Sequence, residues 1–206
     1  MSVLNLLEKY QGSFEHAQQV AFLSQLLFTQ TRGILHNHPE EVGHLLWSAS
    51  MLHDLGMFVS RNGHHKHSYY LIKNGGLLGH SEEEVAIIAA IARYHRGSEP
   101  KVTHEAWYTL DLEGRKLVHD LAAFLRIAEA LDRSHRQVVR DLRVMVNASH
   151  RDNKVLNLLL SLHEAETAQS EIWALGEKKA FFEMHFQVSL DVLVQADALV
   201  SAPPND

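Results

Sequence analysis

Apolar residues recur at intervals of three and four along the chain up to about residue 138, which is typical of amphipathic helices. Capping residues and helix breakers divide this stretch into segments. Ser81-x-x-Glu84 is a capping box, and Gly56 suits the end of a helix. The pattern predicts five helices, which begin near Ser13, Pro39, His67, Ser81 and Gly114, the last of them extending to about Arg136.

The pattern changes after Asp141, where two segments favour β-strands. Residues 142–146 alternate, residues 155–162 are β-prone, and a hairpin turn is predicted between them at 151–154. A further helix over 171–186 and a strand over 188–194 follow, before a loose tail. The sequence therefore predicts a mainly α fold, divided into a helical domain (1–138), a small α+β subdomain (139–200) and the tail (201–206).

Composition narrows the classes of function. The 206 residues are 46% hydrophobic and 21% charged, which is ordinary for a globular protein. A formal net charge of −6 argues against general nucleic-acid binding. No apolar stretch approaches a membrane span and the start lacks the pattern of a secretion signal, so a cytoplasmic location is expected. With no cysteine, any metal ligands must be histidines and carboxylates.

Four polar residues fall on the apolar faces of different predicted helices: His16, His53, His95 and Asp132. Burying them without partners would cost a few kcal/mol each, on the order of a lost hydrogen bond or more. A shared divalent cation satisfies all of them at once, and Asp54 lies next to His53. The alternative for any single histidine is a hydrogen bond to a backbone carbonyl. The other His-Asp pair, His119-Asp120, lies off the apolar stripe and is assigned to the surface.

Basic residues cluster near these candidate ligands although the whole chain is acidic. They are Lys66, Arg93, Arg96, Arg126, Arg133 and Arg136. Such a positive pocket suits a small anion, whereas the alternative is that these charges lie on solvated helix faces.

Longer motifs resemble a known family. His16, the segment Leu52-His53-Asp54-Leu55-Gly56 and the distant Asp132 resemble the HD superfamily of metal-dependent phosphohydrolases. The segments 64–72, 91–96 and 125–135 are similar to the C-terminal HD-like portion of the exopolyphosphatase/guanosine pentaphosphatase family, and the likeness covers about residues 14–195. The resemblance implies an HD-type helical bundle followed by a small α+β C-terminal subdomain.

The resemblance also implies roles for individual residues. His16, His53, Asp54 and Asp132 correspond to the ligands of one metal ion. A second ion would be held by His67 and His95, with His64 or His65 as substitutes for His67. Mn, Mg, Fe, Co and Zn all suit such ligands, as one or two ions. Asp54 could bridge two ions, and Lys66, Arg96 and Arg133 would neutralise phosphate oxygens.

The sequence differs from the full-length phosphatases, in which the resemblance assigns catalysis to an actin-like domain that this chain lacks. Because the ligand set is complete here, we expect a phosphohydrolase that acts on a phosphate ester or anhydride of a small, nucleotide or polyphosphate-like substrate by metal-activated water. The alternative is a non-catalytic module that binds polyphosphate or a guanine alarmone. A third interpretation is a dimerisation domain, for which the apolar segment 155–162 is the only indication, so a homodimer is also considered.

Overall fold

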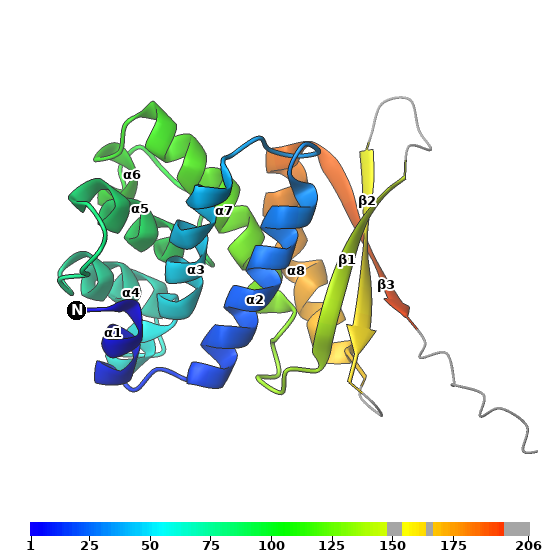
Figure 1. Cartoon of the computed structure of the whole chain (residues 1–206), viewed down its shortest axis with the longest axis horizontal. Helices are drawn as coiled ribbons and strands as arrows, with labels where there is room; N and C mark the ends of the chain where they lie inside the picture. Colours follow the sequence, from blue (N-terminus) through cyan, green and yellow to red (C-terminus); the bar gives the residue numbers. More distant parts are fainter. Residues whose placement is uncertain (148–153, 164–166, 196–206) are drawn as a thin grey trace, which may run out of the picture.

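The computed structural model describes residues 1–147, 154–163 and 167–195 (Figure 1). The predicted tail and most of the predicted turn at 151–154 lie outside these ranges. The α-helices are α1 (Val3–Lys9), α2 (Phe14–Thr31), α3 (Gly43–Leu52), α4 (His64–Lys73), α5 (Glu82–Arg93), α6 (Glu105–Tyr108), α7 (Leu112–Ala130) and α8 (Gln169–Phe186). Two 3₁₀ segments, η1 (Glu40–Val42) and η2 (Leu55–Phe58), flank α3. The strands are β1 (Val139–Asn147), β2 (Lys154–Leu162) and β3 (Val188–Gln195).

Helix α7 is the central element of the core. It packs against α2, α3, α5 and α8, and its residues 120–128 are all buried. Over residues 120–128 the helix has no solvent face, so the apolar residues of this part are spread around its whole circumference. None of the helices within the described ranges is both long and apolar enough to cross a bilayer.

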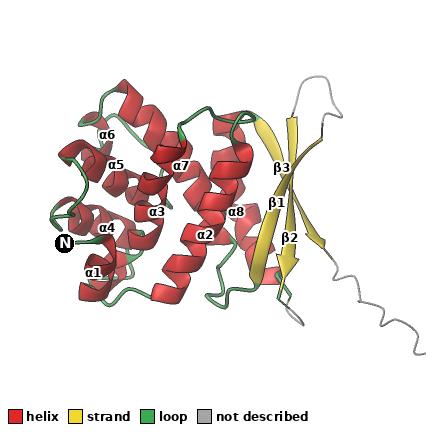
Figure 2. Cartoon of the chain, in the orientation of Figure 1, coloured by secondary structure: helices red, strands yellow, loops and turns green. Residues whose placement is uncertain are grey.

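The three strands form one small sheet beside the helices, in the order β1-β2-β3 (Figure 2). β1 and β2 are antiparallel, whereas β3 pairs parallel with β2 after the chain has passed through α8. Leu156, Leu158 and Leu160 of β2 are buried, and α2 and α8 contact the sheet through β1 and β3. The fold is thus mainly helical, with a small C-terminal sheet that shares α8 with the helical core.

The predicted elements are confirmed with shifted ends, and α1 and α6 were not predicted. α4 begins at His64 rather than His67, directly after Gly63, whose backbone is left-handed (φ 69°). α7 ends at Ala130, well before the predicted Arg136. Two residues that follow, His135 and Gln137, have left-handed backbones (φ 57° and 55°), which an α-helix cannot accommodate.

Gly56 fixes the contact between η2 and α4. A Cβ atom at this position would meet the carbonyl oxygen of His64 at 2.0 Å and the amide nitrogen of Ser68 at 2.6 Å. The Gly56 amide donates to the Ser68 hydroxyl (2.9 Å), which in turn donates to the carbonyl of His53 (2.6 Å). The His53-Asp54 segment is therefore held against the start of α4, with the two backbones in direct contact.

Replacing Gly56 by alanine is expected to force these two backbones apart. We predict that Gly56→Ala lowers the free energy of unfolding in urea by about 1–3 kcal/mol, the usual cost of overpacking. Gly176→Ala is the matched control, because Gly176 lies in α8 with nothing within 4 Å of an added Cβ. That change should stabilise the protein by about 0.5–1 kcal/mol. Equal effects of the two substitutions would contradict the close approach at Gly56.

Candidate metal centre

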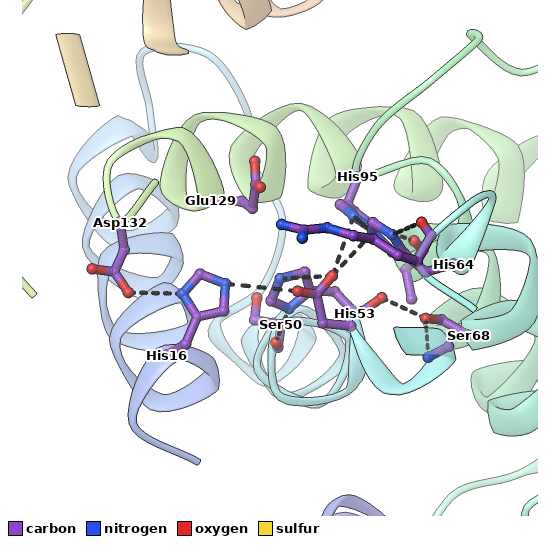
Figure 3. A network of polar contacts seen from close by, with 12 residues as sticks. His16, Ser50, His53, His64, Ser68, His95, Glu129 and Asp132 are labelled. Carbon is purple, nitrogen blue, oxygen red and sulfur yellow. Dashed lines mark hydrogen bonds and ion pairs between the residues drawn. The ribbon is translucent and has the colours of Figure 1, made fainter. Parts of the chain in front are cut away.

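Four histidine rings from separate elements converge on one point (Figure 3). His16 lies in the first turn of α2, His53 directly follows α3, His64 is the first residue of α4, and His95 follows α5. His16, His53, His64 and His95 are all almost completely buried. Asp54, next to His53, is the carboxylate that they surround.

Each ring directs its Nε2 atom towards Asp54. The distance from Nε2 to Asp54 Oδ1 is 3.1 Å for His64, 3.6 Å for His53 and 3.7 Å for His95. The Nε2 of His16 lies 4.0 Å from the other oxygen, Oδ2. Two overlapping groups of three ligand atoms result, and each is compact enough to hold a metal ion: His16 with His53 and Asp54, and His64 with His95 and Asp54.

The opposite nitrogen of each ring is held by an acceptor. Nδ1 of His53 bonds to the carbonyl of Ser50 (2.7 Å), and Nδ1 of His95 bonds to that of Ala92 (2.6 Å). His64 makes the same contact with a carbonyl three residues earlier, that of Arg61 (3.1 Å). Because a carbonyl can only accept, these three rings carry their proton on Nδ1 when neutral.

The Nδ1 atom of His16 is also hydrogen-bonded, but to a carboxylate instead of a carbonyl. Its Nδ1 bonds to Asp132 Oδ2 at 2.7 Å, and the other oxygen, Oδ1, accepts from the amide of Gln137 (2.8 Å). The ring of His135 stacks on that of His16 with centroids 3.7 Å apart. Asp132 and the loop after α7 therefore set the orientation of His16.

These contacts leave four Nε2 lone pairs facing a carboxylate. The Nε2 atoms of His16 and His53 are buried without a hydrogen-bond partner, and those of His64 and His95 face each other at 3.2 Å. Two acceptor lone pairs at that distance repel each other unless a proton or a cation lies between them. Nitrogen and oxygen donors with their outer atoms hydrogen-bonded are the arrangement found around protein-bound divalent metals, so the residues present fit such an ion.

Burial keeps the imidazoles of His53 and His95 neutral. It lowers the pKa of His53 to about 4 and, together with the charge of His53, takes the pKa of His95 well below its usual range. Burial alone would raise the pKa of Asp54, but the surrounding His53, His64 and His95 outweigh it and lower that pKa strongly. At neutral pH the cluster therefore offers the neutral imidazoles of His53 and His95 and the ionised carboxylate of Asp54, the forms that bind metals.

The structure does not bring all of the predicted site residues together. His16, His53, Asp54 and His95 lie in the cluster, whereas Asp132 is hydrogen-bonded to His16 and is absent from both groups of ligand atoms. On α4 the residue that faces Asp54 is His64, named in the sequence analysis as a substitute, while the side chain of His67 is half-buried away from these groups.

A basic cavity of about 420 Å³ opens beside Asp54. Arg96 and Arg133, two of the three predicted cations, line it together with Asp54 and His64. Lys66, the third, is exposed on α4 and does not line it. Sequence reasoning missed the other polar residues of this wall, which are Arg61, Asn62, Glu129 and His135. Arg61 and His135 each lie within three residues of a predicted ligand, and this proximity is a signal that could have identified them.

The surface assignment of His119-Asp120 is wrong. Asp120 is 4% exposed, and its two oxygens bond to His38 Nε2 (2.6 Å) and His185 Nε2 (2.5 Å). His119 contacts His185 through their Nδ1 atoms (2.6 Å). Burial would raise the pKa of Asp120, but His185 and His38 outweigh it and lower the value to about 2. This second cluster joins α7 to α8, and among the described residues it is not one of the groups that could hold a metal ion.

Comparison with known proteins identifies a family and a relative that matches part of the chain. The guanosine-5'-triphosphate,3'-diphosphate pyrophosphatase of Pseudoalteromonas translucida (strain TAC 125) is 37% identical over 57 residues, which are 28% of this chain and 12% of that protein. The chain thus matches only a small part of that relative's length. The pattern described as "Ppx/GppA phosphatase, domain III" matches residues 1–179. Because that match spans most of the chain, the protein belongs to the Ppx/GppA phosphatase family, through its domain III.

Proposed function

We propose that this protein is a metal-dependent phosphohydrolase of the HD type, which hydrolyses a phosphate ester or anhydride. The observation that carries the proposal is the set of four inward Nε2 lone pairs around the ionised Asp54. A shared hydrogen-bond network would need protons between these atoms, and the Nδ1 contacts place the protons on the opposite side of each ring. Membership of a phosphatase family supports the substrate class.

The proposed ligands follow from the two groups of atoms. His16 and His53 would hold one ion and His64 and His95 a second, with Asp54 shared between them. Asp132 would orient His16 through Nδ1 and strengthen it as a donor, as carboxylates do next to ligating histidines. Divalent ions bound at such a site would polarise the phosphoryl group of the substrate and activate a water molecule.

The cavity beside Asp54 supplies part of the positive charge that a phosphate needs. Arg61, Arg96 and Arg133 line it, and a guanidinium binds phosphate oxygens through two parallel hydrogen bonds. These side chains would bind and orient the phosphoryl group and compensate the negative charge that increases on its oxygens in the transition state.

A second candidate function is phosphate binding without hydrolysis. It is favoured by one observation, that the chain corresponds to a single domain of a larger phosphatase and to 12% of the relative it matches. In that case the same cavity would hold a phosphate group as part of an assembly, and no turnover would be measured with any divalent metal.

Asp54→Asn tests the metal centre. Because Asp54 is shared by both groups of ligand atoms, we predict that this variant binds Mn²⁺ at least about a hundredfold more weakly and loses hydrolysis of p-nitrophenyl phosphate. Asp120→Asn, in the other His/Asp cluster, is the matched control and should keep the Mn²⁺ content of the wild type, measured by elemental analysis. Loss of metal in both variants, or in neither, would refute the assignment. Wild-type protein that binds Mn²⁺ and phosphate but turns over no phosphate ester would favour the binding module.

The stability of the metal-free protein is predicted to fall as the pH decreases from about 6.5 to 4. The pKa of His53 is about 4 in the folded chain against 6.5 for a free side chain, so within this range the unfolded state binds a proton that the folded state does not. For His53 alone the loss amounts to about 3 kcal/mol. Urea unfolding in the presence of a chelator measures it. His53→Gln should show a shallower decline, and stability that is constant over this range would contradict the neutral, buried state of the ring.

A further inference from the structure

A lysine from the C-terminal helix α8 lies at the edge of the candidate metal centre. The Lys178 side chain is only 24% exposed and forms an ion pair with Glu129 of α7, which is 12% exposed. Glu129 lines the same cavity as Asp54 (Figure 3 shows its position beside the cluster). Near the start of α8, Glu171 accepts a hydrogen bond from the amide of Ser134 (3.0 Å). Two polar contacts therefore join α8 to the last turn of α7 and the loop that follows it.

Lys178 faces a second cavity that adjoins the first. This cavity, of about 460 Å³, is lined by His95 of the cluster and by Arg96, which also lines the cavity with Asp54. Lys178 on one side and Glu129 on the other thus lie at the boundary between the two spaces. Burial lowers the pKa of Lys178 to about 8, Arg96 lowers it further and Asp54 opposes this, so Lys178 is within electrostatic range of both residues.

The charges around this boundary are not balanced for a phosphate ligand. Asp54 and Glu129 are both carboxylates in the first cavity, and each would repel an incoming phosphate group. Lys178 neutralises Glu129, and an ammonium group has three donors, so it can bind a phosphate oxygen while it keeps the carboxylate contact. A lysine that only balanced the charge of Glu129 could lie on any neighbouring element. It would not need to line a cavity that His95 and Arg96 also line.

We propose that Lys178 contacts the phosphate group bound beside Asp54, and that Glu129 is a positioning residue that holds the ammonium group there. This inference rests on the proposed function of the metal centre. It assigns to the C-terminal α8 a direct part in anion binding, in addition to its packing against α7.

Binding of inorganic phosphate to the Mn²⁺-loaded protein, measured by calorimetry, tests this role. Lys178→Met removes the charge at similar length and should weaken phosphate binding by about tenfold to a hundredfold, while Lys178→Arg should remain within about threefold of the wild type. Lys179→Met is the matched control, because Lys179 is the next residue and pairs instead with Glu183 (3.1 Å) and the carbonyl of Leu190 (2.7 Å). It should bind phosphate as the wild type does.

A double variant separates anion contact from a structural role. Lys178→Met leaves Glu129 buried without its partner, whereas Glu129→Gln combined with Lys178→Met removes the stranded charge. If Lys178 contacts phosphate, the double variant stays about tenfold or more weaker than the wild type, with an unchanged Mn²⁺ stoichiometry. Recovery of wild-type phosphate affinity in the double variant, or an unchanged affinity in Lys178→Met, would overturn the role of Lys178 alone. Wild-type protein that binds no Mn²⁺ would instead overturn the proposed function and this inference with it.

Discussion

The repulsion between inward-facing imidazole lone pairs is the constraint on which the site depends. His53, His64 and His95 each direct Nε2 to within 3.7 Å of the same oxygen of Asp54, and their Nδ1 atoms are committed to backbone carbonyls. Uncompensated, this arrangement is unfavourable in a buried environment, where electrostatic interactions are weakly screened. A cation would turn each of these unfavourable contacts into a bond, and this is the physical basis of the proposed metal centre.

The fold creates this arrangement by repeating one local contact, a hydrogen bond from a histidine ring to a nearby backbone carbonyl. Three of the histidines follow a carbonyl three residues earlier in the chain, at the end of a helix (His53, His95) or at the start of one (His64). Carbonyls in the last turn of a helix, such as those of Ser50 and Ala92, lack an intrahelical donor, so the ring of His53 or His95 satisfies the backbone and fixes its own orientation at once. Gly56 and Ser68 then set the distance between the His53-Asp54 segment and α4. The same contacts therefore stabilise the fold and position the candidate ligand atoms.

The periodicity of the sequence predicted which side chains are buried within regular helices, but it did not predict the positions of side chains at and beyond the helix ends. His16 was placed correctly because it lies on a buried face inside α2. On α4, residues 64–67 include three histidines, and His64 and His67, three residues apart, differ by only about 60° around the helix axis, so spacing could not distinguish them. Asp120 was misplaced because residues 120–128 of α7 are all buried, so this part of the helix has no solvent face to compare with. The parallel pairing of β3 with β2 depends on the path through α8, which no local pattern encodes.

The charge of the centre also bears on the choice between hydrolysis and phosphate binding alone. With His53 and His95 neutral and Asp54 ionised, the cluster contains a negative charge at neutral pH, whereas the charge of Glu129 in the same cavity is compensated by its ion pair with Lys178. A phosphate group beside Asp54 would be repelled by its carboxylate, even with Arg61, Arg96 and Arg133 on the wall. A module that only binds phosphate gains nothing from four lone pairs directed at a carboxylate, because arginines alone would serve it better. A centre that must first bind divalent cations and then a phosphate needs that arrangement, so the arrangement favours the proposed hydrolytic function over phosphate binding alone.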